Sequence, residues 1–266
     1  MGIRPLGNTD PSASVPPPPI TDSGHPMTDT DLIDRLAAAQ RAYASDVDPA
    51  PYAALDREAG YRIQLGVKDA LGRKVGMLKT AVHAEGVGVV APIYADGIIT
   101  APARLSARGV IGLEVEVGMV LGRDLPTDPA TDPAHVAAAI DHYFLGVEIC
   151  GTRFTDRKAA GPNGGLADNM SALGYAVGPR RFGGEVGGLE VVLEFGGKTI
   201  HAAPSKHAFG DTLASLVAYA KNQHPAYPLR AGTIITTGSM CGLVATSGPG
   251  HVVARLAHER LEFDLV

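Results

Sequence analysis

The chain has 266 residues, of which 45% are hydrophobic and 19% are charged, an ordinary composition for a globular core. Its formal net charge is −5 and no long basic run occurs, which argues against a nucleic-acid or anionic-membrane surface and favours small-molecule partners. No apolar run approaches the ~20 residues of a membrane-spanning helix. Cys150 and Cys241 do not form a CxxC pair, so we expect reduced thiols in a cytoplasmic protein.

The first segment, residues 1–27, is rich in proline and small polar residues and contains the run Pro16–Pro19. It lacks the apolar stretch of a signal peptide, and its polar composition cannot bury enough apolar surface to order itself. We therefore expect a disordered extension.

A helical segment is predicted over residues 28–72. Thr30 or Asp31 can cap a helix over about 31–45, and a second helix is expected over about 51–71. A later helix is predicted to begin at Asp132-Pro133, with aspartate as the N-cap and proline at the first helical position.

From Lys74 onward the chain changes to short apolar runs separated by glycine, which predict many strands. Gly196-Gly197 is typical of a two-residue hairpin turn, and one more helix is expected over about 211–221. The predicted strands are about 98–100, 111–121, 145–150, 174–178, 189–195, 198–202, 233–237, 242–246, 251–256 and 260–265. Because these strands do not alternate regularly with helices, an α+β fold is favoured over a doubly wound sheet.

Two acids, Glu114 and Glu116, interrupt the most apolar of these runs, residues 110–121. Alternation along a strand places both on one face, about 7 Å apart. Two ionised carboxylates so placed would be costly to bury and would repel each other, and a divalent cation removes both problems. The alternative is a strand whose second face is simply solvated.

Glu148 is likewise the sole acid in a short apolar run, residues 145–150. Three oxygen donors without an accompanying cysteine or histidine pair suit a hard cation such as Mg²⁺ or Mn²⁺. Three carboxylates on one divalent ion leave about one negative charge, so a cationic side chain is expected nearby.

Three further segments have both a functional and a structural interpretation. Lys74 stands between glycines where backbone can approach a ligand, although most lysines are simply solvated. Residues 166–171 cluster polar groups that also suit a helix cap or an Asx turn. The segment 234–239 ends in a small-polar turn that can hold a carboxylate, and turn chemistry alone explains it equally well.

Five segments in this order resemble the 2-keto-4-pentenoate hydratase and 4-oxalocrotonate decarboxylase family, within the fumarylacetoacetate hydrolase superfamily. The segments are Gly72–Gly76, Leu113–Leu125, Val147–Arg153, Ala167–Ser171 and Ala231–Gly238. The resemblance covers about residues 30–266. It implies a mixed β-roll over residues 73–266 with peripheral helices, and a homo-oligomer.

The resemblance also implies roles for particular residues. Glu114, Glu116 and Glu148 match the ligands of a Mg²⁺ or Mn²⁺ ion. Lys74 matches the active-site lysine, which is expected to contact the substrate and to supply positive charge next to an enolate or relay a proton. Asp168, Asn169 and Ser171 fall in the polar segment beside the substrate, with Asp168 expected to be catalytic. Thr237 is expected to contact the substrate carboxylate.

One segment departs from the family pattern. Hydratases of this kind carry an acidic Pro-Asp-Phe-Gly-like segment soon after the lysine, whereas residues 86–97 offer only Asp96, several residues late. The expected function is a lyase that hydrates a small 2-oxo acid or dienol, such as 2-hydroxypenta-2,4-dienoate. A 4-oxalocrotonate-type decarboxylase, an acylpyruvate hydrolase and a catalytically silent 2-oxo-acid-binding paralogue are the alternatives.

Overall fold

The computed structural model describes residues 27–83, 85–182 and 188–266. The expected disordered extension, residues 1–27, lies outside the described residues except for Met27. The described part contains six α-helices, α1 (Asp29–Ala42), α2 (Ala50–Ala53), α3 (Arg57–Leu71), α4 (Pro133–Ala139), α5 (Gly161–Ala167) and α6 (Ala214–Ala220). Of these, none is long and apolar enough to cross a membrane.

The strands form two sheets. The larger has the order β2-β1-β10-β5-β6-β7-β3, with β11 also paired to β5, and the smaller has the order β4-β13-β12-β8-β9. Their bounds are β1 (Val75–Val82), β2 (Gly88–Tyr94), β3 (Ile98–Thr100), β4 (Arg104–Leu105), β5 (Gly112–Leu121), β6 (Ile140–Cys150), β7 (Ala172–Phe182), β8 (Glu190–Phe195), β9 (Lys198–Pro204), β10 (Ile234–Ser239), β11 (Val244–Ala245), β12 (Gly250–Leu256) and β13 (Glu259–Leu265).

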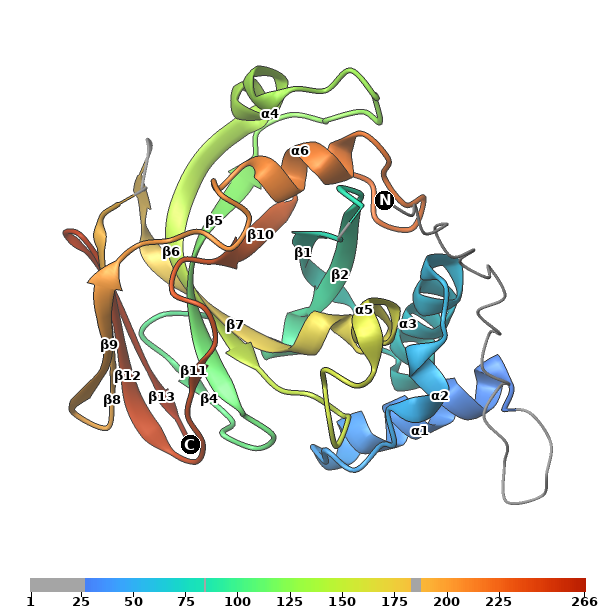
Figure 1. Ribbon diagram of the computed structural model, residues 1–266. Helices are drawn as coiled ribbons and strands as arrows, with labels where there is room; N and C mark the ends of the chain where they lie inside the picture. The colour runs from blue at the N-terminus through green and yellow to red at the C-terminus, as the bar shows by residue number, and fades with distance from the viewer. Residues whose placement is uncertain (1–26, 84, 183–187) are drawn as a thin grey trace, which may run out of the picture.

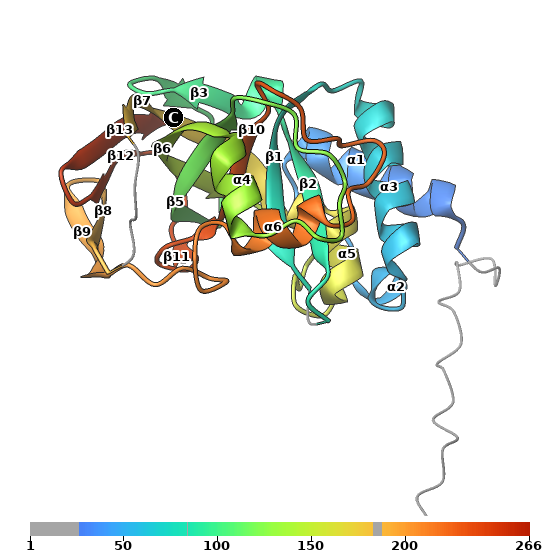
Figure 2. The same cartoon turned by 90° about the horizontal axis from the view of Figure 1, so that it is seen from above.

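The larger sheet curls into a half-barrel, so that β2 near one end comes into contact with β7 near the other (Figure 1). Helix α6 packs on β1 and β2, and the pair α1 and α3 forms a separate layer beside the sheet, as the view from above shows (Figure 2). This mixed-sheet architecture with peripheral helices confirms the predicted α+β fold.

The smaller sheet packs against the outer face of the curl. Val115, Val117 and Val147 from β5 and β6 contact residues such as Leu193 and Phe263 of the smaller sheet in one buried cluster. Because side chains alternate across a strand, Glu114 and Glu116, which flank Val115, point to the inner face of the curl. The two glutamates therefore share a face because the other face is used for the core.

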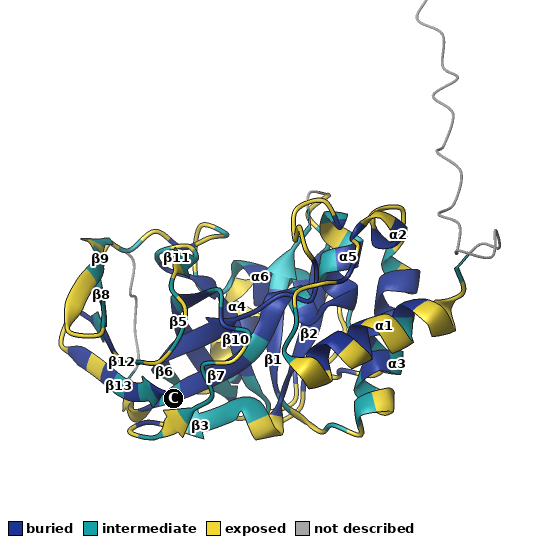
Figure 3. Ribbon diagram, turned by 90° about the horizontal axis from the view of Figure 1, so that it is seen from below, coloured by how far each residue is buried: buried dark blue, intermediate teal, exposed yellow. Residues whose placement is uncertain are grey.

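Helices α1 and α3 each bury one face and expose the other (Figure 3), and the buried residues are mostly apolar, so both helices are amphipathic. Thr28 and Asp31 form a capping box at the start of α1, so the helix begins two residues earlier than predicted. The helix predicted over 51–71 is divided, because the Asp56 side chain accepts a hydrogen bond from Ala59 N–H and starts α3 anew.

Other local predictions are confirmed. Asp132 caps α4 with Pro133 at its first position. Gly196 (φ 57°) and Gly197 (φ 78°) form the two-residue turn between β8 and β9, whose paired positive φ values glycine adopts without strain. The prediction missed β1 and β2, because the glycines at 72 and 76 suggested a turn and Pro92 lies inside β2. A proline is tolerated there because β2 is the last strand of its sheet.

Candidate metal centre

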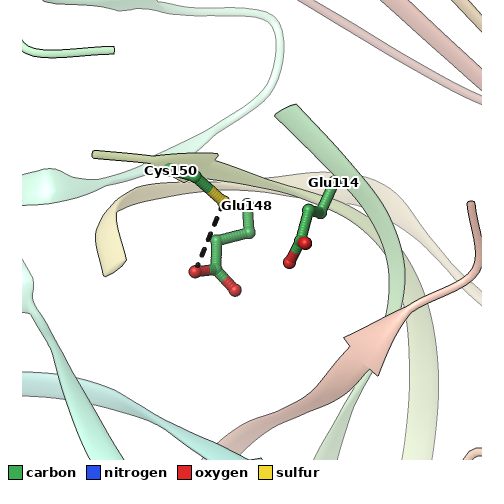
Figure 4. Close-up of side chains that lie close together, drawn as sticks. All are labelled: Glu114, Glu148 and Cys150. Atoms are coloured by element: carbon green, nitrogen blue, oxygen red, sulfur yellow. Dashed lines mark hydrogen bonds between the residues drawn. The ribbon is translucent and has the colours of Figure 1, made fainter. Parts of the chain in front are cut away.

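Glu114 and Glu148 lie directly opposite each other on the paired strands β5 and β6, and Glu116 lies opposite Gly146. Residues facing each other across a strand pair have side chains within reach of one another. Figure 4 shows the carboxylates of Glu114 and Glu148 side by side inside the curl, with Cys150 beside Glu148. One ligand atom from each of these three residues lies within 4.8 Å of the other two.

A lysine completes the charge arrangement, as the sequence led us to expect, but it is Lys79 and not Lys74. Lys79 Nζ lies 2.6 Å from Glu148 Oε1 and 3.9 Å from Glu114 Oε2. Burial acts to lower the pKa of Lys79, yet the charges of Glu148 and Glu114 outweigh burial and raise it, so the ammonium form is held. Lys74 instead precedes β1, where its side chain is exposed.

Glu116 is connected to two neighbouring strands through hydroxyl groups. Thr236 Oγ1 on β10 donates a hydrogen bond to Glu116 Oε2, and Tyr175 Oη on β7 donates to Thr236 Oγ1 at 3.2 Å. The ring of Tyr175 reaches this position because Gly146 leaves room: a Cβ there would overlap the Tyr175 hydroxyl. Five consecutive strands of one sheet, β1-β10-β5-β6-β7, therefore contribute the side chains described so far, which are Lys79, Thr236, Glu114, Glu116, Glu148 and Tyr175.

Among the described residues, two of the three glutamate carboxylates have an oxygen atom without a hydrogen-bond partner. Both Glu116 and Glu148 are fully buried, and Glu116 Oε1 and Glu148 Oε2 have no hydrogen-bond partner in the described part of the chain. Burial raises the pKa of Glu148 to about 7, against the opposing effect of Lys79; burial and then Glu148 raise the pKa of Glu116 well above its usual value. These two buried, unpaired oxygens suit a divalent cation with oxygen ligands, although of the three predicted ligands only Glu114 and Glu148 belong to the group whose ligand atoms lie within 4.8 Å of one another.

Asp168, which was expected to be catalytic, forms a buried ion pair with Arg153. Its carboxylate accepts hydrogen bonds from Arg153 Nε, from Arg153 N–H at 3.1 Å and from Thr152 Oγ1 at 3.0 Å. Burial raises the pKa of Asp168, and Arg153 opposes that effect. With both oxygens engaged, Asp168 is suited to fixing the following turn and not to proton transfer.

That turn, residues 169–171, brings a backbone carbonyl to the lysine. Asn169, Met170 and Ser171 have φ values of 50°, 51° and 66°, a left-handed conformation that costs non-glycine residues about 1 kcal/mol each. The Met170 carbonyl accepts a hydrogen bond from Lys79 Nζ at 3.3 Å. Arg153 pairs with the Asp168 carboxylate and also donates a hydrogen bond to the Asp168 carbonyl, so the residue before the turn is fixed. The turn in this position directs the Met170 carbonyl toward Lys79.

Three of the residues expected to bind substrate, Asn169, Ser171 and Thr237, are buried, whereas the fourth, Lys74, is exposed. Asn169 Oδ1 and Thr237 Oγ1 have no hydrogen-bond partner among the described side chains and backbone, so each has capacity for a ligand. Ser171 accepts a hydrogen bond from Gly151 N–H through its carbonyl. Asp96 is exposed and pairs with Arg73 at 3.4 Å, on the surface.

Sequence reasoning missed Lys79, Thr236 and Tyr175. Lys79 is the one basic residue in the run Val75–Val82, so the criterion that singled out the isolated glutamates would also have found it. No comparable signal marks Thr236 or Tyr175, because a threonine and a tyrosine are ordinary strand residues.

The chain is similar in sequence to proteins named as hydratases. It is 30% identical over 203 residues to 2-keto-4-pentenoate hydratase of Paraburkholderia xenovorans (strain LB400), a match that covers 72% of this chain and 73% of that protein. It is 28% identical over 222 residues to the TodF product hydratase of Pseudomonas putida, covering 76% and 81%.

Solved structures share the fold. The 4-oxalocrotonate decarboxylase from Pseudomonas putida G7, complexed with magnesium and adipate, superposes with a TM-score of 0.74 at 20% identity, over 90% of this chain and 99% of that one. The 2-hydroxyhepta-2,4-diene-1,7-dioate isomerase from Mycobacterium marinum gives a TM-score of 0.53 at 17% identity, over 73% and 76%. The family model described as fumarylacetoacetate (FAA) hydrolase C-terminal matches residues 79–260, from Lys79 in β1 to the start of β13. The chain therefore belongs to the fumarylacetoacetate hydrolase family.

Proposed function

We propose that this protein is a divalent-metal-dependent hydratase that adds water to a small 2-hydroxydienoate, such as 2-hydroxypenta-2,4-dienoate, in the breakdown of aromatic compounds. The observation that carries the proposal is the set of three inward-facing glutamates beside a buried lysine, with two carboxylate oxygens left unpaired. The relatives named as hydratases support the choice of reaction.

Glu114, Glu116 and Glu148 are the residues that would hold Mg²⁺ or Mn²⁺ through their oxygens. Such a cation, when bound, supplies Lewis-acid stabilisation of negative charge on the substrate oxygens. Lys79 holds a proton at Nζ and places positive charge at the same site, which favours an enolate over the neutral substrate. The lysine is therefore proposed as electrostatic stabiliser and proton donor, in the role that the sequence suggested for Lys74.

Other residues bind and orient. Asn169 Oδ1 and Thr237 Oγ1 are proposed to take hydrogen bonds from or to the substrate, which would satisfy buried polar atoms that otherwise lack partners. Thr236 and Tyr175 keep Glu116 in place through their chain of hydrogen bonds. Asp168 and Arg153 fix the 169–171 turn.

The proposal is tested by assaying purified protein with Mg²⁺ against three substrates, 2-hydroxypenta-2,4-dienoate, 2-oxohex-3-enedioate and fumarylpyruvate. We expect turnover of the first, seen as loss of dienol absorbance. Carbon dioxide release from the second alone would instead identify a decarboxylase, and cleavage of the third alone would identify a hydrolase. Binding of a 2-oxo acid without turnover of any of the three would identify the silent paralogue.

A further inference from the structure

We propose that Glu114, Glu148 and Cys150 form a second binding mode for a divalent cation, one that selects thiophilic ions such as Cd²⁺ or Zn²⁺ and uses Cys150 as a thiolate ligand. This mode overlaps the all-oxygen site of Glu114, Glu116 and Glu148 but replaces Glu116 by sulfur. The inference does not depend on the proposed hydratase activity.

The geometry already approximates such a site. Cys150 Sγ lies 3.7 Å from Glu148 Oε1, and the ligand atoms of all three residues lie within 4.8 Å of one another (Figure 4). A tetrahedral zinc with Zn–S near 2.3 Å and Zn–O near 2.0 Å separates its sulfur and oxygen ligands by about 3.5 Å. The sulfur–oxygen pair therefore needs almost no movement, and the Glu114 side chain has to close the remaining distance. Glu114 is the one partly exposed member, so it has the freedom to do so.

A second observation, independent of the proximity, points to a ligand. Glu148 is fully buried, yet its Oε2 atom has no hydrogen-bond partner in the described residues. A buried carboxylate oxygen left unpaired carries a desolvation cost that a bound cation removes.

The sulfur atom of Cys150 determines which ions this mode binds more tightly. Thiolate is a soft ligand that favours Zn²⁺ and related ions, whereas Mg²⁺ takes oxygen. The Cys150 thiol is buried and donates weakly to Glu148 Oε1, so in the metal-free protein it is a neutral thiol. On binding, the metal–sulfur bond replaces the sulfur–hydrogen bond and the proton passes to solvent, with no change in oxidation state.

The charges balance in this mode when Glu116 keeps its carboxyl proton. The two charges of the ion and the one of Lys79 then equal those of the Glu114 and Glu148 carboxylates and the Cys150 thiolate, and Glu116 is no ligand in this mode. Lys79 Nζ now sits 2.6 Å from Glu148 Oε1, so the ion has to share or displace that contact. Thiophilic ions are consequently expected to compete with Mg²⁺ or Mn²⁺ for Glu114 and Glu148.

The test is titration of the purified protein, freed of metal, with Cd²⁺, followed by near-ultraviolet thiolate-to-metal charge-transfer absorption. The wild-type protein is expected to develop this absorption band on binding one Cd²⁺. Cys150→Ser is expected to lose the band and to bind Cd²⁺ at least about tenfold more weakly, because a hydroxyl group replaces a soft sulfur ligand. Cys241→Ser, which changes the other, half-buried cysteine, is the matched control and should keep the band. Absence of the band in wild type, or its persistence in Cys150→Ser, would overturn the proposal.

A measurement on wild type keeps the test valid if Cys150→Ser does not fold. Cadmium NMR of the one-to-one complex should show a resonance in the range of mixed sulfur and oxygen ligation, and a resonance in the oxygen-only range would refute the thiolate mode. Mn²⁺ titration separates this outcome from failure of the proposed function. Mn²⁺ binding and dienoate turnover without a cadmium–thiolate signal would refute the thiolate mode alone. A thiolate signal without turnover of any substrate would refute the hydratase alone.

Discussion

Two lysines five residues apart make a matched pair, because Lys79 is buried against Glu148 and Glu114 while Lys74 is exposed. If Lys79 supplies the positive charge that stabilises the reaction, Lys79→Met should lower kcat at saturating Mg²⁺ by about 10²-fold or more, the scale of losing one preorganised electrostatic partner. Lys74→Met should leave kcat within about twofold, since exposed side chains that touch no substrate contribute little to turnover. Steady-state kinetics with the dienoate decides between them; a large loss in Lys74→Met with little change in Lys79→Met would reverse the assignment.

The three glutamates are expected to act as metal ligands individually. Replacing Glu114, Glu116 or Glu148 by glutamine leaves one neutral oxygen in place of a charged carboxylate, so each substitution should weaken Mg²⁺ or Mn²⁺ binding by at least about tenfold. Glu190→Gln is the control, because Glu190 is an exposed glutamate on β8, in the other sheet. Calorimetric titration with Mn²⁺ measures the effect. Unchanged affinity in all three site variants would mean that the cluster does not hold the ion.

At the scale of the strand, glycines shape the inner face of the curl. Gly146 on β6 leaves the space that the Tyr175 ring fills, and Gly118 on β5 does the same for Phe144. A sheet that must curve around a site filled with polar groups gains room where a side chain is missing. The position of Glu116 therefore depends indirectly on a residue with no side chain at all.

Gly146→Ala should push Tyr175 out of place and break its hydrogen bond to Thr236. We expect the free energy of unfolding to fall by about 1–3 kcal/mol from overpacking, and metal affinity to fall with it because Glu116 loses its support. Gly165→Ala is the control: it lies inside α5 with no atom near the added methyl group, where alanine favours the helix by up to about 1 kcal/mol. Urea denaturation of both variants checks this prediction. Equal stability of Gly146→Ala and wild type would show that Tyr175 adjusts freely.

The elements predicted from sequence were those with local signals. The hairpin at Gly196-Gly197, the cap at Asp132 and the isolated glutamates are each recognisable within a few residues, and all appear in the structure. Lys79 meets Glu148 from 69 residues away, a contact that only the order of strands creates. The ion pair between Asp168 and Arg153 was missed for the same reason, because no local sequence pattern around Asp168 indicates that Arg153 is its partner.

The stability of the whole molecule should depend on pH through Glu148. The pKa of Glu148 is raised from 4.5 to about 7 in the folded state. Below pH 4.5 the carboxyl is therefore protonated in both the folded and the unfolded chain, and the stability that the raised pKa contributes is fully present. Between pH 4.5 and about 7 the unfolded chain releases the proton first, so stability is lost as pH rises. Because a tenfold difference in proton affinity between the folded and unfolded states corresponds to about 1.4 kcal/mol, the loss is on the order of 3 kcal/mol.

Glu148→Gln isolates this contribution from other titrating groups. In chelator, the difference in unfolding free energy between wild type and Glu148→Gln should change across pH 4.5–7 in the direction just given. Saturating Mg²⁺ should reduce the loss in wild type, because a bound cation favours the ionised carboxylate. A difference that stays flat over this range would contradict the raised pKa of Glu148.

Five consecutive strands contribute the three glutamates, Lys79, Thr236 and Tyr175, and this limits how the site can change during evolution. Backbone hydrogen bonds join each of these strands to the next, so no hinge separates one of these residues from another. Amide protons of β5 and β6 should accordingly exchange with solvent only when the entire domain unfolds. Inserting or deleting one residue in such a strand would turn its acids to the valine face and destroy the site. New substrates are then accessible to this scaffold through the loops beyond the strand ends, while the strands themselves keep their length.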